Sequence, residues 1–344
     1  MVGPPASTRA RNVTVADVAR YAGVSPAVVS YVINDGPRRV APATADRVRN
    51  AIDVLGYRPN SSARALRTGT TGMLGLVLPG TSNSFFGEYA DVIYDAAASN
   101  GFALLTASSA GKVPTEHRLI EELAGRNVDG ILVATMMTKA DIPSLRHPGL
   151  PIVLINCPFA VPGYRTLGPD AVAGARAVVD HLLSVHGHQS VAFITGETGA
   201  HEPEAREAGW RDALRSHGRP DGLLVRTDFT RAGGYEAAQR VLAGSDRPTA
   251  MFVSSDLQAF GVLRAIREQG LDVPGDLALV TFDGIEESAF SWPPLTLTQQ
   301  PLQAMAEAAI NALLSGNDAA HDLFPMELII RQSCGCMNNG GHSA

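Results

Sequence analysis

The sequence predicts an α/β chain in two parts: a small all-α headpiece, then a two-lobed body built on doubly wound parallel sheets. The first 72 residues carry apolar side chains at helical spacing. From Met73 onward, short apolar runs alternate with stretches of helical length, in two sets that break between Asn156 and Thr166. At 344 residues the chain has room for two or three domains.

Charge divides the chain at the same place. Residues 1–72 hold ten arginines and four aspartates, a net charge of +6, whereas the whole chain carries -6 and the remainder therefore -12. A basic head on an acidic body favours a polyanionic partner for the head alone. A solvated basic tail is the alternative, and the periodic apolar residues among the arginines disfavour it.

Composition predicts a cytoplasmic protein with reduced thiols. Three cysteines, Cys157, Cys334 and Cys336, are too few for a disulfide framework, and the N-terminus lacks the apolar core of a signal peptide. The sequence contains no uninterrupted apolar run of about 18 or more residues, so no membrane span is indicated.

The first helix is predicted to begin after Thr14, behind a flexible tail of residues 1–12. Thr14 and Asp17 have the spacing of a capping box, in which each side chain accepts a hydrogen bond from the other residue's backbone amide. The helical pattern stops at Gly23, which can adopt the positive φ of a tight turn.

A second helix is predicted to begin at Pro26, capped by Ser25 and buried through Val28, Val29, Val32 and Ile33. Two short helices joined by such a turn form a helix-turn-helix, whose second helix presents its N-terminal residues to the DNA major groove. A bare helical hairpin fits the same spacing. The outward positions are Pro26, Ala27, Ser30, Tyr31 and Asn34.

A third helix is predicted from about Pro42 to Leu55, with Gly56 as its C-cap. After it, Asn60 can cap a segment of barely two turns that reaches Arg67. Such a segment is too short to be helical alone in water. It is either a linker or a helix that forms only against a supporting surface.

The segments TVADVARYAGVS, VVSYVIN and GYRPNSSARALR resemble the start of the LacI/GalR family of bacterial transcription repressors. The resemblance implies a homodimer that binds a palindromic double-stranded DNA operator under the control of a small-molecule effector. It assigns residues 13–59 to the headpiece and 60–71 to a hinge helix and linker; the hinge helix pairs with that of the partner in the minor groove, where Leu66 wedges a base step apart. The DNA-contacting residues that it implies are Thr14, Ser25, Pro26, Ala27, Val28, Ser30, Tyr31, Asn34, Thr44, Tyr57, Asn60, Ala63 and Leu66.

The headpiece departs from the family pattern at several positions. Val28 stands where the family most often has Thr, Tyr31 where it commonly has Arg, and Ala41 where a Ser usually caps the third helix. The loop after Asn34 is also one residue longer than usual. Without the Arg, a donor suited to a guanine edge is missing, so the operator is expected to differ from that of Arg-bearing relatives.

The body, residues 72–334, is predicted to hold buried parallel strands in the runs MLGLVLP, FALLTAS, GILVAT, PIVLIN, VAFITG, LLVRT, AMFVSS and LALVTF. Doubly wound sheets bind ligands in a crevice at the carboxyl ends of their strands. A sugar-binding protein, an oxidoreductase and a hydrolase all fit this pattern. The sequence shows no dinucleotide fingerprint, phosphate-binding loop or nucleophile elbow, so we expect neither an enzyme nor a cofactor.

The resemblance continues through REAGWRDAL, SSDLQAFGVLRAI, VPGDLALVTFDG and ELIIRQS, and implies a sensor of the periplasmic-binding-protein type. The effector residues that it implies are Phe86, Asp170, Arg206, Phe229, Asp256 and Asp283. Each aromatic fits a core role equally well, and for Asp256 a structural cap is favoured over ligand contact.

The pocket is not expected to suit a plain monosaccharide. Ser255 and Ala171 stand where the family usually has Asn, which removes two amides that recognise hydroxyls. The preceding loop adds His201, Glu202 and Glu204, which favour a polar or cationic ligand unless the loop is merely solvated. The effector is therefore a sugar or another small polar metabolite.

A metal site is not expected at the C-terminus. Cys334 and Cys336, one residue apart, do not complete a structural zinc set even with His342 nearby. Family chains end here in a variable tail, so residues 335–344 are expected to be disordered. His186 and His188 flank Gly187 in a turn, where loop roles are favoured over metal ligation.

Overall fold

The computed structural model describes residues 13–33, 38–58, 69–80, 82–135, 142–145, 147, 149–196, 204–244, 247–316 and 319–336. Contacts divide the chain into two compact units, one ending at Thr71 and one beginning at Gly72. Among the described residues, no helix is both long and apolar enough to cross a membrane.

The headpiece contains three helices: α1 (Val15–Ala22), α2 (Pro26–Ile33) and α3 (Pro42–Leu55). The capping box at α1 is present, since the Asp17 amide donates to the Thr14 hydroxyl and the Thr14 amide to the Asp17 carboxylate. Gly23 ends α1 with a φ of 66° and so makes the turn into α2. The three helices share one apolar core, formed by Val18, Ala19, Ala22, Val29, Val48, Ala51 and Tyr57.

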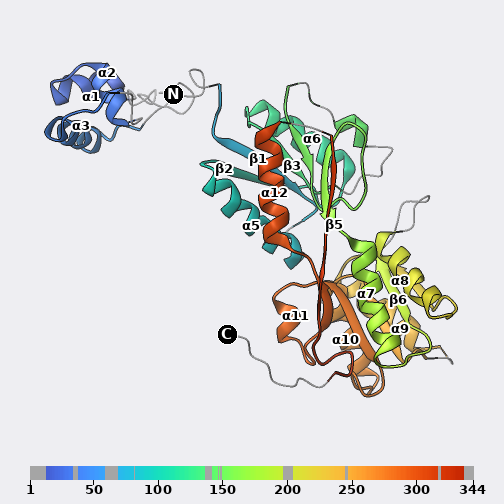
Figure 1. Cartoon of the computed structure of the whole chain (residues 1–344). Helices are drawn as coiled ribbons and strands as arrows, with labels where there is room; N and C mark the ends of the chain where they lie inside the picture. Colours follow the sequence, from blue (N-terminus) through green and yellow to red (C-terminus); the bar gives the residue numbers. More distant parts are fainter. Residues whose placement is uncertain are drawn as a thin grey trace, which may run out of the picture. The chain divides into compact units, whose positions relative to one another are not determined.

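The body contains two six-stranded sheets, seen as two lobes in Figure 1. The first has the order β11-β5-β4-β3-β1-β2, and all its pairs are parallel. Its strands are β1 (Met73–Leu78), β2 (Ala103–Ser108), β3 (Ile131–Val133), β4 (Ile152–Leu154), β5 (Arg165–Pro169) and β11 (His321–Phe324).

The second sheet has the order β12-β10-β9-β8-β6-β7. Its pairs are parallel except for the edge strand β12, which runs antiparallel to β10. Its strands are β6 (Ala192–Gly196), β7 (Leu224–Thr227), β8 (Ala250–Val253), β9 (Ala278–Asp283), β10 (Thr296–Gln299) and β12 (Glu327–Ile329).

Helices cover both faces of each sheet. In the first lobe α5 (Ser84–Ser99) and α12 (Leu302–Ser315) pack together on one face, and α6 (Val113–Gly125) packs on the other with the short η1 (Ile142–Leu145). In the second lobe α7 (Ala171–Ser184) and α8 (Ala205–Ser216) cover one face, and α9 (Arg231–Leu242) and α10 (Asp256–Glu268) the other. Figure 1 shows α12 in the first lobe, although it follows the second lobe's strands in sequence. The doubly wound architecture is confirmed.

Each of the eight predicted runs contains a strand, but β5, β10, β11 and β12 were not predicted. The predicted break between Asn156 and Thr166 falls too early, because β5 still belongs to the first sheet and the chain enters the second lobe only after Pro169. The chain returns to the first lobe for α12 and β11, so each lobe combines segments that are distant in sequence.

Contacts also join the two lobes near α11 (Glu287–Phe290). Ser84 Oγ donates a 2.8 Å hydrogen bond to the Glu287 carboxylate, and the Glu286 amide donates a 2.9 Å hydrogen bond to Glu88. Ile285, which follows a second-lobe strand, is buried in the core of the first lobe.

Candidate DNA-binding and effector-binding sites

The N-terminal end of α2 is uncharged and open to solvent. Ser25, Pro26 and Ala27 are exposed, whereas Ser30 and Tyr31 are partly buried. The Ser25 carbonyl accepts the first helical hydrogen bonds from Val28 and Val29. Exposed small residues followed by one tyrosine can approach base edges closely but supply no charged side chain for the phosphates.

The apolar face of α2 differs from the predicted stripe at one position. Val29 is fully buried, and Val32 and Ile33 pack partly buried against the same core. Val28 is not among the residues that pack against this core, and it is only partly buried. It is therefore the member of the stripe best placed to face outward.

The remaining predicted DNA contacts vary in accessibility. Thr14 is exposed and Thr44 partly buried, whereas Tyr57 lies in the core with 9% of its surface exposed. Packing is the main role of Tyr57, and only its small exposed part could meet DNA. The predicted contacts Asn34, Asn60, Ala63 and Leu66 lie outside the described residues.

Exposed positive charge lies on other segments of the headpiece. The Arg20 and Arg49 side chains are 78% and 63% exposed and pair with Asp17 and Asp46 on their own helices. The other described headpiece arginines are also exposed: Arg38, Arg39, Arg47 and Arg58.

The candidate effector site is a cavity of about 550 Å³ between the lobes of the body. It lies at the carboxyl ends of strands from both sheets, where doubly wound folds bind ligands. Its volume suits a small metabolite. Its lining residues are Pro79, Gly80, Ser82, Asn83, Phe85, Phe86, Ala110, Gly111, Thr135, Asn156, Pro158, Pro169, Ala171, Glu204, Arg206, Asp228, Phe229, Thr230, Ser255, Phe282, Asp283 and Gln300.

Arg206, in the first turn of α8, is the main cation of this cavity. Its guanidinium lies 5.3 Å from the Phe229 ring centre and 5.0 Å from that of Phe282. It donates hydrogen bonds to the Glu204 carboxylate and to the Ser254 carbonyl. These contacts fix the plane of the guanidinium, so its orientation is set before any ligand arrives.

Asp283 ends β9 and has only 7% of its surface exposed. Its φ is 100°, a rare conformation for a residue other than glycine, and Gln300 donates a 2.9 Å hydrogen bond to its carboxylate. Burial raises the pKa of Asp283 to about 6, although Arg206 and Gln300 act to lower it. The carboxyl group therefore changes charge near neutral pH.

Phe229 depends on the glycine at the end of β6. A Cβ at Gly196 would overlap the Phe229 ring, so the glycine allows this aromatic side chain to lie directly against the strand. Phe86, at the start of α5, forms an edge-to-face pair with Phe85. Four of the six predicted effector residues thus line the cavity: Phe86, Arg206, Phe229 and Asp283.

Asp170 and Asp256 do not line the cavity, and both have structural roles instead. Asp170 caps α7 by accepting a 3.0 Å hydrogen bond from the Ala173 amide. Asp256 is fully buried and accepts 2.8 Å hydrogen bonds from the Gly284 and Ile285 amides. Burial and the neighbouring Asp283 raise the pKa of Asp256. Asp256 thus holds the loop after Asp283 in place.

Two polar lining residues have clear roles that the sequence did not reveal. Glu204 holds Arg206 and accepts a 2.8 Å hydrogen bond from the Thr195 hydroxyl, and Gln300 orients Asp283. Glu204 was predicted only as part of a polar loop, whose members His201 and Glu202 lie outside the described residues. Gln300 follows β10, a strand that the sequence did not indicate.

Comparison with known proteins agrees with this architecture. Residues 14–60 match the model of bacterial regulatory proteins of the lacI family, and residues 179–334 match a periplasmic binding protein-like domain. The chain is 33% identical to catabolite control protein A of Priestia megaterium, over 88% of this chain and 92% of that protein. It is 34% identical to the ribose operon repressor of Escherichia coli K12 over the same shares of each chain. The chain belongs to the lacI family.

Solved structures of the family match both units. A lac repressor dimer bound to operator and the anti-inducer ONPF has a TM-score of 0.85 and 25% identity, over 94% of this chain and 99% of that one. A complex of the transcriptional regulator CelR with cellobiose has a TM-score of 0.68 and 28% identity, over 94% of this chain and all of that one. As a lacI-family member, the protein is a DNA-binding transcriptional regulator with an effector-binding sensor domain.

The end of the lacI-family sensor differs from the predicted disordered tail. Cys334 is 1% exposed and Cys336 partly buried, so the chain packs against the body through residue 336. The reason for expecting no metal here was also wrong, because the two cysteines meet His181 and His186 of the second lobe. His188 does have a loop role, with its ring Nδ1 2.9 Å from the Thr249 hydroxyl. Residue His342 lies outside the described residues.

Proposed function

We propose that the protein is a homodimeric repressor that binds a palindromic operator and is controlled by a small polar effector bound between its lobes. The main support is the combination, in one lacI-family chain, of a capped helix-turn-helix and an interlobe cavity with a fixed guanidinium. A twofold-symmetric dimer matches a twofold-symmetric DNA site. Such a regulator acts in the cytoplasm, on the nucleoid.

Base recognition is assigned to α2, and attraction to phosphates to the exposed arginines of the headpiece. Ala27 and Val28 can meet thymine methyl groups, and Tyr31 can donate its hydroxyl to a base or phosphate. Phosphate contacts position the protein but carry no sequence information. The operator is therefore expected to differ from those read by relatives with Arg at the position of Tyr31.

The hinge is assigned to residues 60–71, with Leu66 as the side chain that wedges a base step. A segment of this length is marginal as a helix in water, so contacts with DNA or with its partner can decide whether it forms. Effector binding between the lobes would alter their alignment in the dimer, and a modest change there can favour or disfavour the paired hinges.

The effector is assigned to small polar molecules rich in hydrogen-bond donors. The cavity offers three carboxyl groups, Glu204, Asp228 and Asp283, against the single described cation Arg206. This balance favours a neutral or cationic ligand over a carboxylate or phosphate. Aromatic rings at Phe86 and Phe229 can contact apolar faces, as those of a sugar. Among the solved relatives, a family regulator from Enterococcus faecium contains bound ribose.

A mobility-shift assay on DNA from upstream of the protein's own gene tests the proposal, repeated across a panel of sugars, polyols and amines. We expect a sequence-specific complex whose affinity changes with at least one metabolite, and the direction distinguishes induction from corepression. Binding no tighter than to a scrambled duplex would contradict the proposal.

Deleting residues 1–72 separates this function from its rival, a ligand-binding protein or enzyme with docked N-terminal helices. A repressor loses operator binding and keeps its effector, because the body forms a separate compact unit. The rival would keep its whole activity after the deletion. Consistent with the regulator, the relatives named above include a ribose operon repressor, a lac repressor and the transcriptional regulator CelR.

A further inference from the structure

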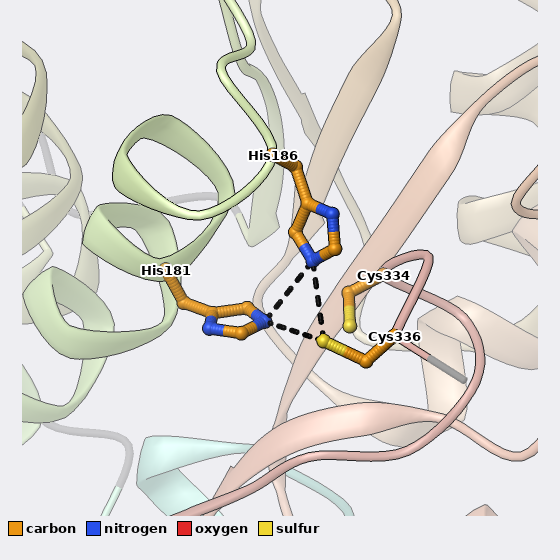
Figure 2. A group of neighbouring side chains, drawn as sticks. All are labelled: His181, His186, Cys334 and Cys336. Atoms are coloured by element: carbon orange, nitrogen blue, oxygen red, sulfur yellow. Dashed lines mark hydrogen bonds between the residues drawn. The ribbon is translucent and has the colours of Figure 1, made fainter. Parts of the chain in front are cut away.

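Two histidines and two cysteines meet in the second lobe, and none of them lines the effector cavity. His181 lies in the last turn of α7, His186 follows that helix, and Cys334 and Cys336 follow β12. The ligand atoms of all four side chains lie within 4.8 Å of one another. In Figure 2 the two imidazole rings and the Cys336 sulfur point toward a common centre, with Cys334 beside them.

Three of the four ligand atoms have the separations expected around a tetrahedral zinc ion, and the Cys334 sulfur lies within 4.8 Å of them. His181 Nε2 and His186 Nε2 are 3.3 Å apart, and Cys336 Sγ lies 3.5 Å and 3.4 Å from them. A tetrahedral Zn²⁺ with Zn–N of about 2.0–2.1 Å and Zn–S of about 2.3 Å sets two nitrogens about 3.4 Å apart, and a nitrogen and a sulfur about 3.6 Å apart. The three side chains therefore need almost no movement to share one ion.

The local fold brings the two cysteines to the histidines. Gly335 turns the chain between them with a φ of 105°, and its amide donates to the Gln332 carbonyl. A Cβ at this glycine would lie 3.3 Å from two atoms of the His186 ring, so the imidazole packs directly on the Gly335 backbone. Cys334 is anchored from the other side, since the Thr296 hydroxyl donates a 3.2 Å hydrogen bond to its sulfur.

The ligand set selects a borderline-soft divalent ion. Two thiolates and two neutral imidazoles suit Zn²⁺, whereas Mg²⁺ and Ca²⁺ require oxygen ligands. Two thiolates also neutralise the charge of the ion, which matters because His181 is 6% and Cys334 1% exposed. Four protein ligands leave no open position, so the site is structural and not catalytic.

We propose that His181, His186, Cys334 and Cys336 form a tetrahedral structural site for one Zn²⁺ per chain. The ion would tie the segment after β12 to α7. The N-terminal end of that helix reaches the effector cavity through Ala171, so the ion would stabilise one wall of the sensor.

The test uses the full chain without a polyhistidine tag, purified with a non-thiol reductant, loaded with Zn²⁺ or Co²⁺ and dialysed. Elemental analysis is expected to find one Zn²⁺ per chain. The cobalt form is expected to show visible d–d absorption of a tetrahedral ion and a near-ultraviolet thiolate-to-cobalt band. Chelation of zinc is expected to lower the Tm.

Substitutions of single residues test which side chains bind the ion. Cys336→Ser and His186→Gln are expected to lose the retained ion, and Cys336→Ser to weaken the thiolate band. Cys157→Ser and His188→Gln are matched controls that are expected to keep both, since Cys157 lies in the first lobe and His188, whose ring centre is 6.3 Å from that of His186, directs its Nδ1 to the Thr249 hydroxyl. Far-ultraviolet circular dichroism checks that each variant is folded.

Wild-type protein that is folded and reduced but retains no ion and shows no thiolate-to-cobalt band would overturn the proposal. The four side chains would then form only a hydrogen-bonded cluster. Retention of the ion by folded Cys336→Ser and His186→Gln to the same extent as by the controls would also overturn it.

Discussion

Arg206 and Asp283 are the two residues on which effector affinity is expected to depend most. Arg206 lies over two aromatic rings and is held by Glu204 and the Ser254 carbonyl, whereas Asp283 is held by Gln300. Because both groups are oriented before binding, little conformational entropy is lost in ordering them when the ligand binds. Their opposite charges also let one small molecule meet a donor and an acceptor in the same cavity.

Replacing Arg206 by Lys is expected to weaken effector binding about tenfold or more, because an ammonium cannot reproduce a planar fork stacked on Phe229 and Phe282. Isothermal titration with the effector found in the mobility-shift panel measures this loss. Operator affinity without effector is the control and should be unchanged. Unchanged effector affinity in Arg206→Lys would remove Arg206 from the binding site.

The pKa of about 6 for Asp283 predicts a pH dependence of effector binding. A ligand that donates hydrogen bonds prefers the ionised carboxylate, so its affinity should rise as pH increases through 6. For an uncharged ligand the rise is about tenfold between about pH 5 and pH 7, the change in the ionised fraction of one group with this pKa.

Titration calorimetry at both pH values measures this rise, and Asp283→Asn should flatten it, because an amide does not titrate there. An affinity that falls with pH in the wild type would mean that Asp283 binds its ligand as the protonated acid. A slope that persists in Asp283→Asn would assign the titration to another group.

At the scale of elements, the sequence predicts those helices, turns and strands that depend on short-range patterns. The capping box of Thr14 and Asp17, the Gly23 turn and the eight apolar strands all depend on nearby residues or on continuous apolar runs. The unpredicted strands β5, β10 and β11 contain polar or turn-forming residues, and β12 has only three residues; long-range pairing forms all four.

The functional residues could likewise be predicted only where a local sequence pattern marks them. Arg206 and Asp283 were predicted because they lie in family motifs next to strands that the sequence indicates. Asp256 belongs to a similar motif, yet the loop of Gly284 and Ile285 folds over its carboxylate and withdraws it from the cavity. The histidines that complete the cysteine cluster lie about 150 residues earlier, and no local pattern links them.

The hinge element is tested by Leu66→Ala. We expect weaker operator binding with the folded body and effector affinity intact, because Leu66 is assigned to the DNA and not to either core. Operator titration at fixed salt measures the loss. Val54→Ala is the matched control, since Val54 is 59% exposed on α3 and is not assigned to DNA. Equal affinities of Leu66→Ala and wild type would refute the wedge.

At the scale of the whole molecule, the basic head suits DNA binding and the acidic body suits effector binding. Residues 1–72 carry a net charge of +6, while the whole chain carries -6. The head can thus attract phosphates although the protein as a whole is acidic, and the body repels DNA. The two compact units match this division of charge.

This charge division predicts a steep salt dependence of operator affinity. Arginines of two headpieces release counterions from the phosphates, so a plot of log K against log salt concentration should have a slope of about -5 or steeper, as for six or more neutralised phosphates at about -0.9 each. Fluorescence anisotropy across a salt series measures this slope. A flat plot would argue against the basic head as the DNA site.

The central claim is that a ligand in the interlobe cavity controls the affinity of the headpiece for its operator. The most direct test is a mobility-shift titration of the full chain on its own upstream DNA, with and without the effector found in the panel, for wild type and Arg206→Lys. The account predicts that saturating effector changes the wild-type operator Kd, and that Arg206→Lys binds the same operator equally well but needs about tenfold or more effector for the same change. An operator Kd that no metabolite changes, or an identical effector response in both proteins, would contradict it.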